Sequence, residues 1–207
     1  MKGVAILSGG LDSTVSLAVA VRKMEVLLAL TFDYGQRAAR RERRASAAIA
    51  KQYRIPHRVI SVPWLAALTR TALVDRKAEL PRHEMSERSA KAVWVPNRNG
   101  VFIEIAAAHA ESAGATRLIT GFNREEAATF PDNSKAYVGA VNRALSYSTA
   151  NGVRVVSFTI DLDKKGIVRL GRKLGAPLQH IWPCYEGGRA WCGSCESCLR
   201  SLRAIHG

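Results

Sequence analysis

The chain has 207 residues, of which 47% are hydrophobic and 23% are charged. These values are ordinary for a globular protein, and a chain of this length can bury roughly 70% of its unfolded surface without cross-links. No apolar run approaches the ~20 residues of a membrane span, and the N-terminal residues reach two glycines too early for a signal peptide. We therefore expect a cytoplasmic protein with one main domain and no role at a membrane.

The chain is strongly basic, because 31 Lys and Arg residues against 17 Asp and Glu residues give a formal net charge of +14. Part of this excess is concentrated in residues 37–44, RAARRERR. Such a run is most often the solvated face of a helix. It is also typical of a surface that binds nucleic acid or an acidic protein partner. Charge alone leaves these alternatives open.

Short apolar segments predict the strands, and amphipathic segments between them predict the helices. The predicted strands are residues 3–7, 26–32, 58–62, 117–120 and 153–158. The predicted helices begin at a cap on Asp12 or Ser13, cover 37–53, begin at 96–99 and end before Gly114, cover 136–146, and run from a cap at Asp163 to a stop at Gly175. This alternation predicts an α/β protein whose parallel sheet carries helices on both faces.

Two segments differ from this pattern. In residues 64–95 the apolar residues do not recur at a clear helical or strand spacing, so this segment is predicted to be an insertion or a lid. The segment from Cys184 to the C-terminus is short, rich in Cys and Gly, and separate in composition. The predicted organisation is an α/β domain over residues 1–183 and a metal-binding segment over residues 184–207.

The sequence SGGLDS at residues 8–13 lies between the first strand and the first helix, where an open α/β sheet binds its ligands. Gly9 and Gly10 let backbone N–H groups approach an anion closely, and the helix end adds a favourable field. The motif is neither Walker A nor G-x-G-x-x-G. Asp12 would repel phosphate there unless it caps the helix or meets Mg²⁺. In this position SGGLDS resembles the PP-loop of the ATP pyrophosphatase family.

That resemblance implies the Rossmann-like fold of the adenine nucleotide alpha hydrolases. It also implies cleavage of ATP between the α and β phosphates, with AMP left on a substrate oxygen.

All four cysteines lie in the C-terminal segment, at Cys184, Cys192, Cys195 and Cys198. Four thiolates this close together match tetrahedral Zn²⁺, and a turn at Gly193 lets the chain wrap a metal. An iron–sulfur cluster and free thiols are the alternatives, whereas disulfides are not expected in a cytoplasmic chain. A four-cysteine zinc site has no open position, so we expect it to hold Tyr185 and the tail against the body of the protein.

Further segments narrow the resemblance. They are FDYGQR at 32–37, VPNRN at 95–99, GFNREEAATFPDNS at 121–134, IDLDKKGIVRLG at 160–171, and PCYEGG at 183–188 followed by WCGSCESC. Together, in this order over nearly the whole chain, they resemble the 7-cyano-7-deazaguanine synthase family of the queuosine precursor pathway. The resemblance implies ATP-dependent conversion of 7-carboxy-7-deazaguanine and ammonia into the nitrile, through an adenylated carboxylate and an adenylated amide. It further implies ATP, Mg²⁺ and Zn²⁺ as cofactors, and a homodimer.

The resemblance also assigns residues. Those expected to bind ATP are Leu7, Ser8, Gly9, Gly10, Leu11, Asp12, Ser13, Thr14, Thr31, Phe32 and Asp33. Those expected to contact the substrate are Arg98, Asn99, Asn123, Phe130, Asp132 and Tyr185. Asp132 would accept hydrogen bonds from the guanine-like N1–H and amino group, and Phe130 would stack on the ring. Those expected to act in catalysis are Ser8, Asp12, Ser13, Arg98 and Lys164.

Plainer interpretations stand beside three of these assignments. Arg98 could be an exposed residue near a helix start, residues 132–134 could form only a capping turn, and Lys164 could be a solvated lysine in a first helical turn. The family usually carries Glu two residues after this lysine, where this chain has Gly166.

Three other functions remain as alternatives. The first is a related ligase that passes the deazaguanine acyl group to a protein or another amine, and the second is a tRNA-modifying PP-loop enzyme. The third is a nucleotide-binding protein that carries zinc and has no enzymatic activity.

Overall fold

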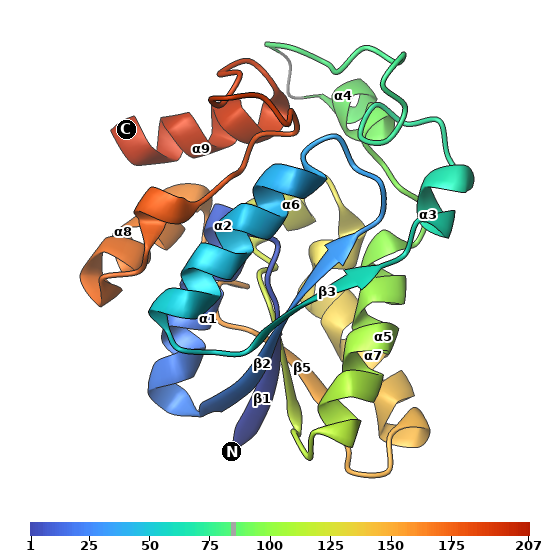
Figure 1. The fold of residues 1–207 in the computed structure, drawn as a ribbon, viewed down its shortest axis with the longest axis vertical. Helices are drawn as coiled ribbons and strands as arrows, with labels where there is room; N and C mark the ends of the chain where they lie inside the picture. The colour runs from blue at the N-terminus through green and yellow to red at the C-terminus, as the bar shows by residue number, and fades with distance from the viewer. Residues whose placement is uncertain (84–85) are drawn as a thin grey trace.

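The computed structural model describes residues 1–83 and 86–207. Its centre is a five-stranded sheet with the order β3-β2-β1-β4-β5 (Figure 1). The strands are β1 (Lys2–Ile6), β2 (Glu25–Asp33), β3 (His57–Ser61), β4 (Arg117–Thr120) and β5 (Arg154–Ser157). All neighbouring strands are parallel, so the predicted sheet is confirmed.

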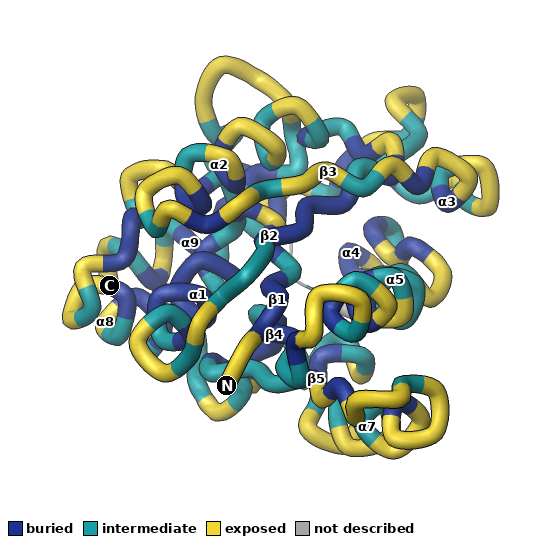
Figure 2. Tube along the Cα trace, turned by 60° about the horizontal axis from the view of Figure 1, so that its bottom comes forward, coloured by how far each residue is buried: buried dark blue, intermediate teal, exposed yellow. Residues whose placement is uncertain are grey.

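Helices cover both faces of the sheet, as the sequence predicts (Figures 1 and 2). On one face, side chains of α1 (Leu11–Lys23), α2 (Ala39–Gln52) and α8 (Lys164–Leu174) share one buried apolar cluster. On the other face, α5 (Arg98–Ser112) and α7 (Lys135–Ser148) share a second cluster. Figure 2 shows β1 buried between these layers, whereas the outer side of α7 is exposed.

The strand order reverses beside β1, which places two loops side by side. The chain runs from β1 outward to β3 and then returns to β4 on the other side of β1. The loops after β1 and β4 therefore meet at the carboxyl edge of the sheet, the usual ligand site of such folds. Contact is close, because a Cβ atom on Gly121 would lie 2.5 Å from the backbone nitrogen of Ser13.

Two helix boundaries test the predicted caps. Asp163 caps α8 as predicted, since its Oδ1 accepts from Gly166 N–H over 2.7 Å. The predicted cap of the first helix is wrong, because α1 begins at Leu11 and its N-cap is Gly10, without a side-chain hydrogen bond. Two glycines in sequence let the backbone turn into the helix earlier than a polar cap residue would indicate.

Residues 64–95 pack onto the main core. They form α3 (Trp64–Ala67) and α4 (Glu87–Ala92), with irregular chain between them. Leu65, Leu73 and Val93 are buried in the same cluster as the side chains of α5. This segment therefore covers the carboxyl edge of the sheet, whereas its opening as a lid stays a prediction.

The C-terminal segment ends in a helix that the sequence analysis did not predict. This helix, α9 (Glu196–His206), begins inside the cysteine motif and packs along α8 (Figure 1). Ala204 of α9 is buried in the same cluster as Ile167 of α8. Shorter elements are α6 (Arg124–Ala127), η1 (Pro131–Asn133) and η2 (Leu178–His180). Within the described ranges, no helix is long and apolar enough to cross a bilayer.

Substituting Gly121→Ala should destabilise the protein, because the added methyl group would collide with backbone atoms of the first turn of α1. We expect a loss of about 2 kcal/mol or more in the free energy of unfolding. Denaturant unfolding followed by circular dichroism measures this change. Gly139→Ala is the matched control, because Gly139 lies within α7 with open space around it and should gain about 0.5–1 kcal/mol. Equal effects of the two substitutions would contradict the proposed close contact.

Candidate functional site

The SGGLDS loop is packed tightly against α2. Gly9 has φ of 78°, in the left-handed region that favours glycine. A Cβ atom there would lie 2.8 Å from the Cβ of Ala45 and 2.9 Å from the carbonyl oxygen of Glu42. The hydroxyl oxygens of Ser8 and Ser13 lie 3.0 Å apart. The loop therefore brings two hydroxyl groups to the amino end of α1.

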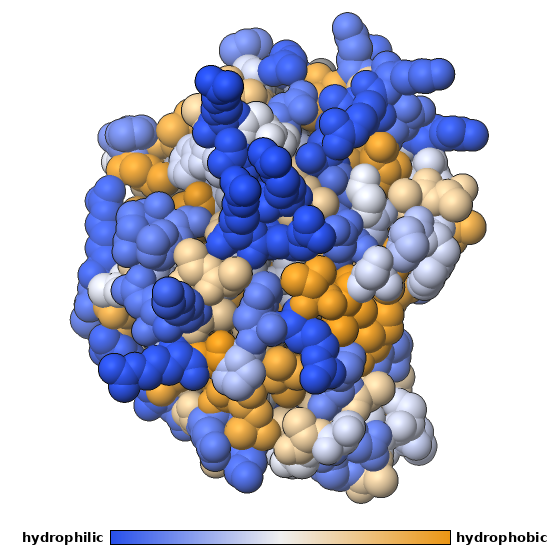
Figure 3. Space-filling view, in the orientation of Figure 1, coloured by the Kyte–Doolittle hydropathy of each residue, from blue (hydrophilic) through white to orange (hydrophobic). Residues whose placement is uncertain are grey.

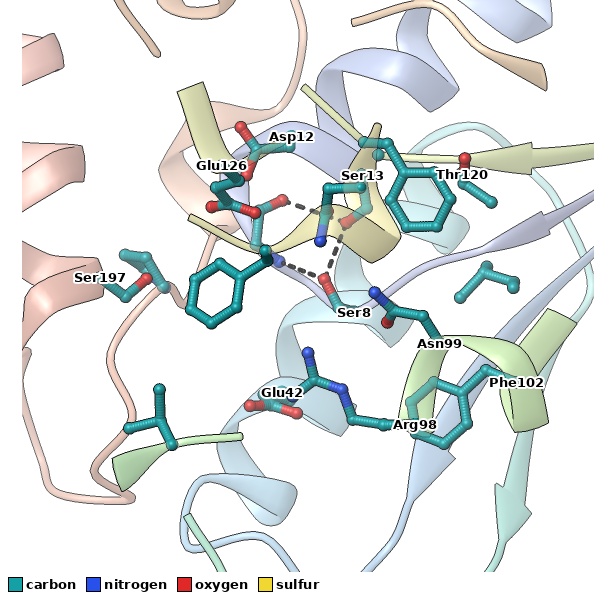
Figure 4. Close-up of a pocket in the computed structure, with 18 of the residues that line it drawn as sticks. Ser8, Asp12, Ser13, Glu42, Arg98, Asn99, Phe102, Thr120, Glu126 and Ser197 are labelled. Atoms are coloured by element: carbon teal, nitrogen blue, oxygen red, sulfur yellow. Dashed lines mark hydrogen bonds between the residues drawn. The ribbon is translucent and has the colours of Figure 1, made fainter. Parts of the chain in front are cut away.

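A cavity of about 260 Å³ lies beside this loop, at the carboxyl ends of β1, β2 and β4. Figure 4 shows residues from opposite walls converging there: Arg98 and Asn99 from the start of α5 lie across from Ser197 of α9. The predicted site residues that line the cavity are Leu7, Ser8, Gly10, Leu11, Asp12, Ser13, Phe32, Arg98, Asn99, Phe130, Asp132, Lys164 and Tyr185.

Among the residues predicted to bind ATP or the substrate, those outside this lining are Gly9, Thr14, Thr31, Asp33 and Asn123. Several of them instead hold the backbone that carries the lining. Thr31 Oγ1 donates to the carbonyl oxygen of Leu7 over 2.6 Å, which ties β2 to the start of the loop. Asn123 is fully buried, and its Oδ1 accepts from Glu126 N–H over 2.9 Å to cap α6.

Lys164 connects three segments at one end of the cavity. Its side chain is only 5% exposed, and its Nζ lies 2.5 Å from both Asp12 Oδ2 and Glu126 Oε1. This burial excludes the solvated lysine considered above. Glu126 was not predicted as a site residue, although its position in the GFNREEAATFPDNS segment was the available signal. The three charged groups join the SGGLDS loop, α6 and α8.

In the triad of Lys164, Asp12 and Glu126, the attraction between opposite charges offsets the cost of burying them. Burial raises the pKa of Asp12 to about 6, although the charge of Lys164 acts against it. Burial would also raise the pKa of Glu126, but Lys164 outweighs it and lowers the pKa below its usual value. Burial disfavours the Lys164 cation, yet the two carboxylates raise the pKa of this lysine. At neutral pH the triad therefore holds two anions around one cation.

Arg98 is anchored at the first turn of α5 and supplies positive charge to the cavity. Asn97 precedes the helix in a left-handed conformation, with φ of 48°. Arg98 Nη1 donates to Tyr34 Oη over 3.3 Å, and its guanidinium lies 5.8 Å from the centre of the Tyr34 ring. Because Arg98 lines the cavity, it is not simply an exposed residue near a helix start.

The wall beside Arg98 carries a pair of aromatic rings and a carboxylate. The rings of Phe130 and Trp94 are stacked, with centres 6.2 Å apart and planes inclined by 12°. Asp132 lines the same wall, and burial raises the pKa of its carboxyl group despite the nearby charge of Arg98. Within residues 132–134, Ser134 is the residue that caps α7, because its Oγ accepts a hydrogen bond from a backbone N–H in the first turn of that helix.

The four cysteine sulfurs gather into one cluster. The Sγ atoms of Cys184, Cys192, Cys195 and Cys198 all lie within 4.8 Å of one another. Backbone N–H groups donate to Cys184 Sγ and Cys192 Sγ over 3.3 Å. Hydrogen bonds from neighbouring thiols, followed by those from the backbone, lower the pKa of Cys184 to about 4. Thiolates are the metal-binding form of cysteine, so this cluster could hold a metal ion.

The cysteine cluster is tied to the segment that covers the cavity. Arg82 pairs with Cys195 in an antiparallel bridge, and its Nη1 donates to Ser194 Oγ over 2.8 Å. His83 N–H donates to the carbonyl oxygen of Ser194 over 2.8 Å. The same segment contributes Leu73, Val93, Trp94 and Val95 to the cavity lining. A metal in the cluster would therefore fix the cover as well as the tail.

Glu42 is a second carboxylate that the sequence analysis missed. It lines the cavity from the first turn of α2, and Gln36 Nε2 donates to its Oε2 over 2.7 Å. Burial raises the pKa of Glu42 to about 7, against opposing effects of Gln36 and Arg98. Its position within the charge run RAARRERR hid its role, because the run indicated a solvated face.

We expect Glu42→Gln to stabilise the protein at high pH. The folded state raises the pKa of Glu42, so it binds the proton more tightly than the unfolded chain does. Stability from this group is present below the ordinary pKa of 4.5 and is lost as the pH rises through about 7. The difference in free energy of unfolding between the variant and the parent, measured by denaturant unfolding, should therefore grow from pH 5 to pH 8 by on the order of 2 kcal/mol. Glu25→Gln, at an exposed position, is the control, and a constant difference for Glu42→Gln would contradict the expectation.

Comparisons with known proteins agree with the family that the sequence motifs indicate. The family model described as "Queuosine biosynthesis protein QueC" matches residues 2–206. A 7-cyano-7-deazaguanine synthase of Pelotomaculum thermopropionicum is 55% identical over 212 residues, covering 99% of this chain and 96% of the relative. The enzyme of the same name from Carboxydothermus hydrogenoformans is 56% identical, covering 100% of this chain and 99% of the relative.

Two solved structures of low sequence identity share the fold. The NMN synthetase of Francisella tularensis superposes with a TM-score of 0.52 at 18% identity, over 91% of this chain and 68% of that one. A 4-thiouridine synthetase–RNA complex with bound ATP gives a TM-score of 0.51 at 21% identity, over 87% of this chain and 42% of that one. Because the family model and the relatives span nearly the full chain, this protein belongs to the QueC family, whose curated relatives at this identity are named 7-cyano-7-deazaguanine synthases.

Proposed function

We propose that this protein converts 7-carboxy-7-deazaguanine and ammonia into 7-cyano-7-deazaguanine, using two molecules of ATP. The observation that carries this proposal is a cavity that is lined together by the SGGLDS loop, Arg98 and the buried Lys164. Relatives covering this chain almost completely bear the name of this enzyme. Charged and aromatic side chains line this one cavity, which supports neutralisation of phosphate charge and binding of a flat base at the same place.

Two adenylations account for the chemistry. A carboxylate oxygen attacks the α-phosphorus of ATP and releases pyrophosphate, after which ammonia attacks the acyl carbon and displaces AMP to leave an amide. The amide oxygen then attacks the α-phosphorus of a second ATP and releases a second pyrophosphate. Departure of AMP, with loss of the two protons from nitrogen, leaves the nitrile. Such steps need positioning and neutralisation of charge more than covalent help from the protein.

The loop and its neighbours would hold the phosphates. Ser8 and Ser13 present hydroxyl groups at the amino end of α1, where the helix favours anions. Arg98 would meet a phosphate or the substrate carboxylate from the opposite wall. Lys164 is already held between two carboxylates, so it would act by fixing the loop as well as by its charge.

Mg²⁺ fits the acidic end of this cavity. Asp12 Oδ2 is bound to Lys164, whereas its Oδ1 is buried and has no hydrogen-bond partner within the described residues. Carboxylate and phosphate oxygens are the ligands that Mg²⁺ prefers. When bound, the ion would neutralise charge on the leaving pyrophosphate, and Asp12 is the residue of this chain that would hold it.

Zn²⁺ fits the cysteine cluster. Four sulfur ligands without an open position are typical of a structural zinc site. The metal would stabilise the tail, and through Arg82 and His83 it would also hold the segment over the cavity. We further infer a cytoplasmic homodimer, which the family resemblance supports.

Transfer of the activated acyl group to a larger amine is the second candidate. The observation that favours it is the basic surface of α2, where Arg40, Arg43, Arg44 and Lys51 are exposed. Figure 3 shows strongly hydrophilic side chains gathered over this part of the molecule. An acidic protein or a nucleic acid could dock there and bring its own nucleophile.

Purified protein given ATP, Mg²⁺, 7-carboxy-7-deazaguanine and ammonium should release pyrophosphate and form the nitrile, which mass spectrometry identifies. Asp12→Ala should lower the rate by about 100-fold or more, because it removes the carboxylate that would hold Mg²⁺ and so neutralise charge at the phosphates. Asp161→Ala is the control, since Asp161 is 69% exposed and pairs only with Lys135 in the described part of the chain. An adduct on a macromolecule would favour the second candidate, and absence of pyrophosphate release would refute the synthase reaction.

Cys195→Ser should remove the metal, because Cys195 is fully buried within the cluster. We expect roughly one zinc per chain in the parent by elemental analysis and a fall of about 5–10 °C in Tm for the variant. Residues 64–95 should also become more sensitive to protease, since their anchor is lost. Ser194→Ala removes the hydroxyl contacts to Arg82 and to Cys192 Sγ but none of the four sulfurs, so this variant should keep the metal. Unchanged metal content in Cys195→Ser would refute the assignment.

A further inference from the structure

One carboxylate in the cavity wall has an oxygen without a partner. Glu196 is the first residue of α9 and is 2% exposed. Its Oε2 has no hydrogen-bond partner among the residues that the structure describes. A buried acceptor left unsatisfied loses the hydrogen bonds that it makes to water in the unfolded chain, so such groups are rare without a reason.

The other oxygen of Glu196 is fully engaged. Arg200 donates to Glu196 Oε1 from Nε over 3.1 Å and from Nη2 over 2.7 Å. The remaining nitrogen, Nη1, donates to Glu125 Oε1 over 3.1 Å. Arg200 therefore fixes the orientation of Glu196, and no N–H group of Arg200 donates to Oε2 in the described part of the chain.

The missing donor is one that a molecule in the cavity can supply. Glu196, Ser197 and Arg200 all line the cavity, and Figure 4 shows Ser197 facing it from the first turn of α9. Tyr185 lines the same cavity as Glu196. An aromatic ring beside a carboxylate suits a flat base with N–H groups at its edge.

We propose that Glu196 accepts a hydrogen bond from the amino-bearing edge of the deazaguanine substrate, and that it thereby selects bases that carry a 2-amino group. This inference rests on the proposed function. It adds a residue to the site and gives Glu196 the task that the sequence analysis assigned to Asp132. Asp132 is less suited to it, because it is partly exposed and its Oδ1 already accepts from Asn133 Nδ2 over 3.1 Å.

Glu196→Gln tests the proposal. The amide oxygen of the new side chain must remain with Arg200, so its NH₂ group takes the place of Oε2 and opposes the N–H of the base. We expect binding of 7-carboxy-7-deazaguanine, measured by calorimetry without ATP, to weaken by about 10- to 100-fold. Glu125→Gln is the matched control: it contacts the same Arg200 but does not line this cavity.

An analogue without the 2-amino group makes the test specific. It should bind the parent protein about 10-fold or more weaker than the full substrate, whereas Glu196→Gln should distinguish the two by less than about 3-fold. The ratio of the affinities for the two bases, measured in one variant, does not depend on how much of that variant is folded. Asp132→Asn and Glu125→Gln should keep the ratio of the parent. Loss of discrimination in Asp132→Asn alone, equal ratios in all proteins, or no discrimination by the parent would overturn the proposal.

The proposed function is tested separately in the same proteins. A parent protein that binds the base with the expected discrimination but releases no pyrophosphate would refute the synthase reaction and leave the role of Glu196 intact. A parent that binds neither base would overturn the role of Glu196.

Discussion

The site depends on Lys164, a cation buried between two carboxylates. Its Nζ lies 2.5 Å from Asp12 and from Glu126, and these three residues begin or belong to three different helices. Removing the lysine would leave two carboxylates unpaired in a buried place, a change that typically costs 3–5 kcal/mol or more. The same ion pairs fix the first turn of α1, so the geometry of the SGGLDS loop depends on α6 and α8 as well as on its own glycines.

A second constraint comes from the C-terminal segment. The cysteine cluster is bridged to Arg82 and thereby to the segment that supplies Trp94 and Val95 to the cavity. Glu196 follows Cys195 directly, so the cluster also sets the position of the first turn of α9. A metal in this cluster can therefore shape the site without any part in the reaction. This arrangement explains why a four-cysteine site without an open position would be useful to an enzyme.

Much of the fold could be predicted because its signals are local. Each predicted strand agrees with an observed one to within one residue at each end, since buried parallel strands are short continuous apolar runs bounded by turn residues. The stop at Gly175 is confirmed by its φ of 62°. Helix α9 was missed because it begins inside the cysteine motif, where composition indicated an irregular tail. The start of α1 was misplaced because a glycine, not a polar side chain, occupies its cap.

The sequence by itself determined the sheet, the phosphate loop, the cysteine cluster and the family. The residues that indicate each of these features lie near one another in the chain or occur as motifs in a fixed order. The tertiary structure alone decided which further charged residues, beyond those that the family motifs assign, face the cavity. Glu42, Glu126 and Glu196 lie in segments that read as solvated or irregular, and only their burial beside Arg98, Lys164 and Arg200 gives them a place in the site. The physical reason is that burial and pairing of a charge depend on segments distant in sequence, which local pattern does not encode.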